Sequence, residues 1–233
     1  MTAPQPHDEA SYRRGERRWL MLALLLGFPL FVIVVLCLPN IGPVLRIYAI
    51  PSSSMAPALP LGGYAVVSRA AYGYSRYSFD DLALPITGRL PMRVPERGDI
   101  LAFRLPRDHD TQFLKRVVGL PGDRIQVVAG RLSINGEPVR LETAAKIPNP
   151  MGDTGEVATS LETLPGGRSY RIVRSEGTPG PYENTPQYLV PPSHLFVLGD
   201  NRPNSTDSRV QSPRFGVGFV PIDLVVGRVL FVF

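Results

Sequence analysis

The strongest constraint on the fold is a long apolar run near the N-terminus. From Trp19 to Leu38 the sequence has twenty residues and no charge. A helix of that length spans roughly 30 Å, which matches the hydrocarbon core of a bilayer. Pro29 lies inside the run, where membrane helices tolerate proline, and Pro39 follows its end. The pattern predicts a transmembrane anchor over residues 19–38.

A removable secretory signal peptide is the alternative interpretation of this run. Its apolar region is usually about 7–15 residues long and precedes a small-x-small cleavage site. The run here is longer, and the residues after Leu38 read PNIGPVLR, which contains no such site. An uncleaved anchor therefore fits the sequence better.

The basic residues beside the run predict its orientation. Those nearest to it are Arg13, Arg14, Arg17 and Arg18 before it and Arg46 after it. The positive-inside bias places residues 1–18 in the cytoplasm and everything after Leu38 outside the membrane. In a bacterium this means a single-pass protein of the inner (cytoplasmic) membrane with its main domain in the periplasm or outside the cell.

Charge and cysteine content exclude several kinds of partner. The net charge is +5 and the pI is about 9.6, but no Lys/Arg run with interleaved aromatic residues indicates nucleic-acid binding. Contact with an anionic lipid bilayer explains the charge as well as a solvated surface does. The single cysteine, Cys37, cannot form an internal disulfide. There is no HExxH motif, cysteine pair or histidine cluster, so we expect no metal and no other cofactor. The oligomeric state stays open.

After the run, short apolar segments alternate with turn residues, which predicts a mostly β outer domain. The pair Asn135-Gly136 predicts a tight hairpin turn. The expected core strands are Leu45–Ile50, Tyr64–Ser68, Ile100–Phe103, Phe113–Val118, Ile125–Val128, Leu195–Leu198 and Leu224–Phe233.

Residues 141–193 differ in composition from the segments on either side. They are rich in Pro, Gly, Thr, Asn and Glu, and only Ser169–Val173 and Gln187–Val190 resemble strands. Their strand-like pieces and tyrosines favour a small inserted β subdomain over a disordered linker. We therefore expect a catalytic β core formed by residues 44–140 and 194–233.

Three polar segments carry candidate chemistry, although each alone could be an exposed loop or edge strand. They are Pro51–Pro57, with three consecutive serines; Phe113–Asp123, with a lysine in an apolar strand; and Gly199–Arg209. Burial of Lys115 would depress its pKa and give the neutral amine that a base must be. Strand alternation does not decide whether Lys115 or Arg116 faces inward.

Histidine offers no support for a Ser-His-Asp triad. Of the three histidines, His7 is expected on the cytoplasmic side, and neither His109 nor His194 has an obvious acidic partner in sequence. Serine enzymes that use lysine in place of histidine exist.

Together and in this order, the segments resemble bacterial type I signal peptidases, the serine/lysine peptidases of family S26. The family patterns PSGSM-x-P, KR-x-VGLPGD and GDNR-x-NS-x-DSR match Pro51–Pro57, Lys115–Asp123 and Gly199–Arg209. The family's RGD followed by an apolar strand matches Arg97–Phe103. The resemblance covers nearly all of residues 44–233 and implies a β-rich catalytic domain after a single N-terminal transmembrane helix.

The resemblance also implies a role for each matched residue. Ser54 is the expected nucleophile and Lys115 its general base. The Ser52 hydroxyl and the Ser54 N–H are expected to bind the oxyanion, and Ser205 to orient Lys115 by a hydrogen bond. A supporting set of ion pairs and hydrogen bonds is implied for Arg116, Asp200, Arg202, Asp207 and Arg209.

Three positions depart from the family patterns. Ser53 replaces a frequent glycine, and would be strained if that position needs a positive φ. Pro203 replaces a residue that is often acidic, and Gly63 stands where an aspartate often follows a glycine. We expect these changes to affect local geometry more than activity.

The activity implied is removal of N-terminal signal (leader) peptides from exported preproteins through an acyl-enzyme, with small residues, usually Ala, at positions −1 and −3 of the leader. A specialised pilin-processing Ser/Lys peptidase of a conjugation system is one alternative. A non-catalytic, membrane-tethered β scaffold that binds exported proteins is another. The complete late segment and the long insertion favour general leader removal.

Overall fold

The computed structural model describes Met21 and residues 25–34, 44–79, 83–152, 154–175 and 180–233. The chain forms two compact units, Met1–Leu45 and Arg46–Phe233.

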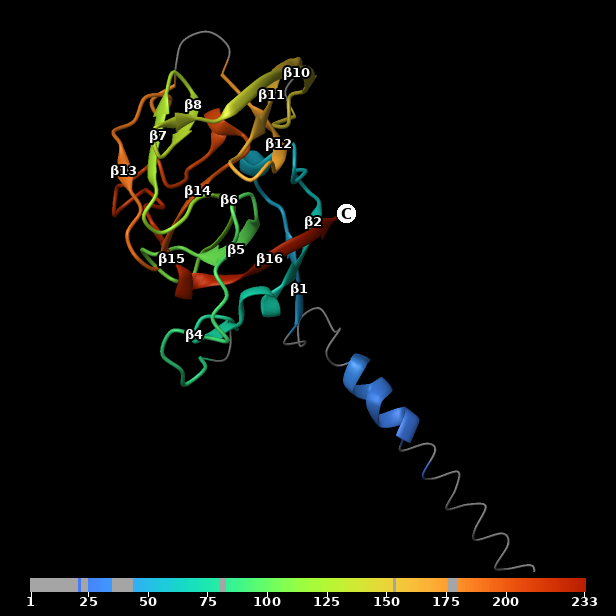
Figure 1. The fold of residues 1–233 in the computed structure, drawn as a ribbon. Coiled ribbons are helices and arrows are strands. Elements are labelled where there is room, and N and C mark those ends of the chain that lie inside the picture. The colour runs from blue at the N-terminus through green and yellow to red at the C-terminus, as the bar shows by residue number, and fades with distance from the viewer. Residues whose placement is uncertain (1–20, 22–24, 35–43, 80–82, 153, 176–179) are drawn as a thin grey trace, which may run out of the picture. The chain divides into compact units, whose positions relative to one another are not determined.

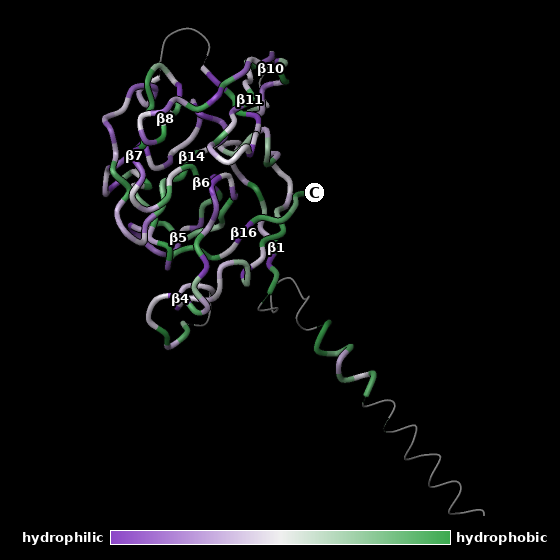
Figure 2. Tube along the Cα trace, viewed as in Figure 1, coloured by the Kyte–Doolittle hydropathy of each residue, from purple (hydrophilic) through white to green (hydrophobic). Residues whose placement is uncertain are grey.

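In the first unit, Met21 and residues 25–34 are helical, and Figure 2 shows that this helix is largely apolar. The rest of the expected anchor and residues 1–18 lie outside the described residues, as do His7 and Cys37. Within the part of the chain that is described, no helix is long and apolar enough to cross a bilayer.

The second unit is mostly β, as the sequence predicts (Figure 1). Its largest sheet has seven strands in the order β1-β2-β16-β5-β6-β14-β15. Neighbours from β2 to β15 pair antiparallel. The strands are β1 (Leu45–Ala49), β2 (Tyr64–Ser68), β16 (Val225–Val232), β5 (Ile100–Arg104), β6 (Gln112–Gly119), β14 (His194–Leu198) and β15 (Val220–Pro221).

Among its described residues, this unit also has three smaller sheets and four short 3-10 helices. One sheet is β13-β7-β8-β9, the second β10-β11-β12 and the third β3-β4. Their strands are β13 (Tyr188–Leu189), β7 (Arg124–Val128), β8 (Arg131–Ile134), β9 (Glu137–Pro138), β10 (Arg140–Pro148), β11 (Glu156–Thr163), β12 (Ser169–Val173), β3 (Tyr74–Ser75) and β4 (Arg89–Leu90). The 3-10 helices are η1 (Ser53–Met55), η2 (Arg69–Tyr72), η3 (Arg202–Asn204) and η4 (Ile222–Leu224).

The hairpin turn at Asn135-Gly136 is confirmed. It joins β8 to β9, and the two residues have φ angles of 57° and 87°. Asparagine and glycine adopt this left-handed region more readily than other residues do.

The hairpin β10–β11 is a difference from the sequence prediction, which expected no strand between residues 141 and 168. Most β10 side chains are at least partly exposed, so apolar residues do not mark the strand. In β11 the buried positions include Ser160 and Glu162, which hides the apolar alternation. The segment 141–193 contributes to two sheets, because β13 pairs with β7. The boundary of an inserted subdomain therefore stays a prediction.

Strand β6 packs against apolar clusters on both faces. Lys115 and Arg116 therefore both face the interior, a point that strand alternation could not decide. Val117 packs in one apolar cluster with Leu101 and Phe103, while Val118 packs in another with Ile125. Lys115 and Arg116 are 3% and 6% exposed. Both cations are therefore buried, and each needs a polar partner to offset the loss of hydration.

Candidate active site

The segment after β1 forms a tight turn that presents Ser54. Ser52 has an extended backbone and precedes η1, and its Oγ accepts a 3.2 Å hydrogen bond from the Ser54 N–H. A serine hydroxyl in this position satisfies an amide that the short helix leaves unpaired. The side chains of Met55 and Leu59 are buried below the turn in one apolar cluster, which fixes the turn against the domain.

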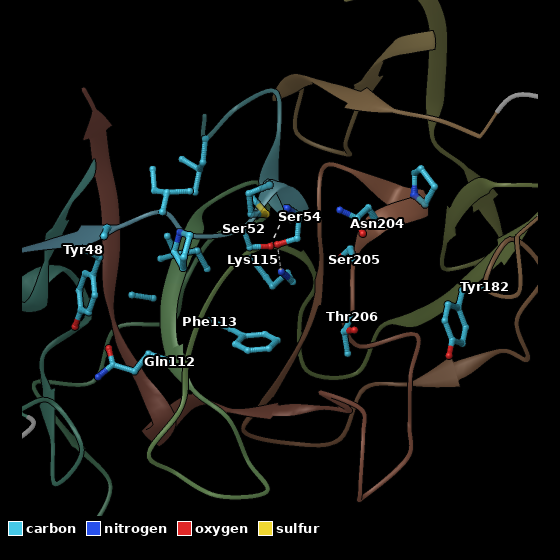
Figure 3. Close-up of a pocket in the computed structure, with 18 of the residues that line it drawn as sticks. Tyr48, Ser52, Ser54, Gln112, Phe113, Lys115, Tyr182, Asn204, Ser205 and Thr206 are labelled. Carbon is cyan, nitrogen blue, oxygen red and sulfur yellow. Dashed lines mark hydrogen bonds between the residues drawn. The ribbon is translucent and has the colours of Figure 1, made fainter. Parts of the chain in front are cut away.

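Lys115 reaches this turn from the middle of β6. Its Nζ lies 2.7 Å from Ser54 Oγ, a hydrogen-bonding distance, and Figure 3 shows the two side chains pointing toward one another. The ring of Phe113 lies on the same side, 5.2 Å from Nζ. The two residues that the sequence proposed as nucleophile and base are in direct contact.

Burial lowers the pKa of Lys115 to about 8. The charges of Asp207 and Asp200 act in the opposite direction, and Arg209 adds to the lowering. Desolvation penalises the ammonium more than the neutral amine. About a tenth of the molecules at pH 7 therefore carry a neutral amine that can accept a proton from a hydroxyl, and this share rises with pH.

Ser54 and Lys115 line a pocket of about 470 Å³ (Figure 3). Ile50, Met55, Leu59, Ala102, Phe113 and Leu114 give it an apolar side, and polar groups come from Tyr48, Ser52, Gln112, Asn204, Ser205 and Thr206. An apolar cavity of this size with a few convergent polar groups is typical of a ligand or substrate site.

Ser205 borders the same pocket, but the hydrogen bond expected between it and Lys115 is not formed. Its Oγ is buried and has no hydrogen-bond partner among the described residues. The hydroxyl lies so close to Gly199 that a Cβ there would come within 2.1 Å of it. The orienting role of Ser205 stays a prediction.

The five expected supporting residues lie together in buried ion pairs. Arg116 donates to both carboxylate oxygens of Asp200, at 2.8 and 2.6 Å. Arg209 likewise binds both oxygens of Asp207, at 2.9 and 2.8 Å. Arg202 pairs with a sixth residue outside the expected set, Glu162 on β11. The pair Arg116–Asp200 therefore ties the segment 199–209 to β6, the pair Arg202–Glu162 ties it to β11, and the pair Arg209–Asp207 lies within it.

The carboxyl pKa values of the two aspartates move in opposite directions. Burial raises the pKa of Asp200, although Arg116 opposes it. Burial also acts to raise the pKa of Asp207, but the Arg209 guanidinium and the N–H of Gly199 outweigh it, and the pKa falls. Asp207 therefore stays ionised near Lys115.

Sequence reasoning missed four residues that complete the network. The buried Glu162 also accepts from the Tyr170 hydroxyl, and the Tyr170 ring lies 4.0 Å below the Arg116 guanidinium. Asn201 and Asn204 bind the serine turn from the late segment. A glutamate within a polar strand resembles a surface residue, so no local pattern could have indicated that it is buried.

The three departures have little effect on backbone strain. Ser53 lies in η1 without a positive φ, so the strain considered for it does not arise. Pro203 is exposed in the first turn of η3, where proline is tolerated. A Cβ on Gly63 would meet the Phe233 carbonyl oxygen at 3.1 Å, which makes this position tight for a larger residue.

The two described histidines do not line the pocket. His109 packs edge-on against Tyr77, and His194 Nδ1 lies 2.8 Å from the Pro192 carbonyl oxygen. Among the residues that the structure describes, no group of three or more His, Cys, Asp or Glu could hold a metal ion.

Comparison of the sequence with known protein families supports the same interpretation as the geometry of the pocket. The family model described as signal peptidase, peptidase S26, matches residues 20–233. The chain belongs to the signal peptidase family S26. The family resemblance seen in the three polar segments is thus confirmed, and with it the enzyme class.

Individual signal peptidases of known name are similar to the chain. Signal peptidase I of Rickettsia typhi is 37% identical over 194 residues, covering 79% of this chain and 70% of that protein. Signal peptidase I of Pseudomonas aeruginosa is 35% identical over 209 residues, covering 86% and 68%. A crystal structure of a signal peptidase I from Enterococcus faecalis is 26% identical and covers 59% of this chain and 98% of that one, with a TM-score of 0.35.

Proposed function

We propose that the chain is a membrane-anchored signal peptidase I that removes leader peptides from exported preproteins, with Ser54 as nucleophile and Lys115 as general base. The observation that carries this proposal is the 2.7 Å contact between Lys115 Nζ and Ser54 Oγ inside the pocket. A serine hydroxyl needs an adjacent base to become a nucleophile, and burial gives Lys115 the depressed pKa of such a base.

The first half of the reaction forms an acyl-enzyme. Neutral Lys115 takes the proton of Ser54 Oγ as that oxygen attacks the carbonyl carbon of the scissile bond. The resulting ammonium then gives the proton to the leaving amine, and the mature protein departs. The leader remains attached to Ser54 as an ester.

The second half of the reaction releases the leader. Lys115, neutral again, takes a proton from a water molecule, which attacks the ester carbonyl. The ammonium returns that proton to Ser54 Oγ as the ester bond breaks. Both halves use one base, so no histidine is required.

The oxyanion site is proposed at Ser52. The N–H of Ser54 points at the Ser52 hydroxyl, 3.2 Å away, so both expected donors lie side by side. A substrate carbonyl oxygen would take over this N–H, while the Ser52 hydroxyl turns to donate as well. Donors of this kind are worth about 3–4 kcal/mol to the transition state in comparable sites.

Substrate class and membrane attachment belong to the same proposal. The leader would carry small residues at positions −1 and −3, and Ala102 and Leu114 would line the apolar side of the pocket that receives them. Residues 19–38 would anchor the chain with residues 1–18 in the cytoplasm. Anchor and pocket would then meet leader peptides on the outer side of the bacterial inner membrane.

We expect Ser54→Ala and Lys115→Ala each to abolish cleavage of a purified preprotein with an Ala-x-Ala leader, because each removes one member of the reacting pair. Cleavage is measured by the shift from precursor to mature protein on a gel. Ser133→Ala on β8 and Lys146→Ala on β10 are matched controls outside the pocket and should cleave normally.

If either dyad variant is folded and still cleaves the preprotein normally, the mechanism is contradicted. A non-catalytic scaffold predicts no cleavage by the wild-type chain either. A specialised pilin-processing enzyme predicts cleavage of pilin precursors but not of general preproteins, so testing both substrates separates the remaining alternatives.

A further inference from the structure

Ser53, the residue before the proposed nucleophile, is buried although its side chain is polar. It is 6% exposed, and its Oγ accepts a 2.8 Å hydrogen bond from Nδ2 of Asn204. Asn204 is the last residue of η3, and Figure 3 shows that it projects toward the turn that carries Ser54. The bond joins two segments that are about 150 residues apart in sequence.

Asn201 holds the same turn through backbone groups. Its N–H donates to the Ser54 carbonyl oxygen at 3.1 Å, and its Nδ2 donates to the Ser53 carbonyl oxygen at 3.1 Å. The backbone at Gly199 packs closely on the same turn: a Cβ at this residue would lie 2.6 Å from the Ser54 carbonyl oxygen. Two hydrogen bonds to peptide carbonyl groups and one to the Ser53 hydroxyl therefore fix the turn around Ser54 to the segment 199–209.

Of these three bonds, the one from Asn204 to Ser53 depends on the side chain at residue 53. Glycine, which the family pattern often has here, could not accept it. Proton transfer requires Oγ and Nζ to stay within about 2.6–3.2 Å of each other. A small rotation of the turn changes that distance directly, since Ser54 lies within η1 next to Ser53.

We propose that Ser53 and Asn204 form a positioning pair, whose side-chain hydrogen bond holds Ser54 Oγ at reacting distance from Lys115 Nζ. Neither side chain exchanges a proton with the substrate in this scheme. The inference rests on the proposed Ser54/Lys115 chemistry.

The test compares Ser53→Ala, Asn204→Ala and the double variant in the full-length protein. With leader-peptide substrate at the pH of maximal rate, we expect each single change to lower kcat by about three- to tenfold, the range for loss of one hydrogen bond. Ser53 does not line the pocket, so Ser53→Ala should leave KM unchanged. The double variant should be no slower than the slower single variant, because both changes remove the same bond.

Two further variants separate positioning from general stability. Ser53→Thr keeps the hydroxyl and should recover most of the lost kcat. Thr163→Ala removes a hydroxyl–hydroxyl bond of 2.8 Å between β11 and β12, so it should keep wild-type kcat.

A readout that needs no activity is hydrogen exchange of the Asn201 N–H, which donates to Ser54. We expect faster exchange in Ser53→Ala and Asn204→Ala, and no change in Thr163→Ala.

Wild-type kcat in Ser53→Ala, multiplied losses in the double variant, or unchanged exchange at Asn201 would each overturn the positioning pair while leaving the proposed dyad intact. A different result would refute the proposed Ser54/Lys115 dyad, namely normal cleavage by Ser54→Ala. In that case the exchange measurement still decides whether Ser53 and Asn204 hold the turn.

Discussion

Lys115 has to lose a proton before it can act as a base, and its burial sets the pH at which this happens. Its pKa is lowered to about 8, so the ammonium dominates below that pH and the neutral amine above it. We expect kcat/KM to fall about tenfold per pH unit below the pKa and to level off above it. Initial rates on a leader peptide between about pH 6 and 10 measure this curve.

A rate that stays constant from about pH 6 to 8 would contradict Lys115 as the titrating base. The substrate used should have no group that titrates in this range. Thermal unfolding followed over the same pH values controls for loss of folded protein.

Single residues also show the limit of what the sequence could predict about the site. Lys115 stood out as a candidate because a cation interrupts an apolar strand, but the choice of Lys115 over Arg116 as the base came from the family pattern. The choice of Ser54 over its neighbours Ser52 and Ser53 came from the family pattern alone, since three serines in one turn are chemically equivalent in sequence. The bond from Asn204 to Ser53 depends on tertiary contact, so no spacing rule could have shown it.

Strand β11 contributes a buried charge to the loop that carries the supporting residues. Both oxygens of Glu162 bind the Arg202 guanidinium, and Glu162 is fully buried. We expect Glu162→Ala to lower the free energy of unfolding by about 3–5 kcal/mol, because Arg202 would be left buried without its carboxylate. Urea denaturation followed by circular dichroism measures the loss.

Tyr170→Phe is the matched control, since it removes one hydrogen bond to Glu162 and leaves the ion pair in place. It should cost only about 1 kcal/mol. If Glu162→Ala unfolds at the wild-type urea concentration, the pair does not stabilise the loop.

The strands differ in how clearly the sequence predicted them. Several strands were predicted closely: Tyr64–Ser68 is marked by a run of buried apolar residues, and in Ser169–Val173 exposed and buried positions alternate over the first four residues. The hairpin β10–β11 was missed, because β10 is largely exposed and β11 buries a glutamate. Strand prediction depends on alternation of apolar and polar residues. This alternation is lost where a strand buries polar residues or where a paired strand is exposed.

For the whole molecule, we expect the full-length chain expressed in a bacterium to remain in the membrane pellet after an alkaline carbonate wash. A spanning segment over residues 19–38 resists this treatment, whereas electrostatic attachment does not. Protease added to intact spheroplasts should digest the domain that follows the anchor, because the positive-inside bias places it outside. Western blotting with an antibody to that domain measures both results.

Release of the chain by carbonate would contradict the anchor. Protection of the domain from the added protease, with digestion after lysis, would contradict the orientation. A cytoplasmic enzyme blotted in parallel shows that the spheroplasts are intact.

The position of β16 in the large sheet has a consequence for when the enzyme becomes active. This last strand lies between β2 and β5, so in the described sheet β1 and β2 join the other strands only through it (Figure 1). With residues 1–18 kept in the cytoplasm, as proposed, synthesis and translocation would deliver the serine turn early and the strand that completes the sheet last. Because pairing between strands far apart in sequence is slow, we expect the unfinished chain to stay inactive until β16 has joined the sheet.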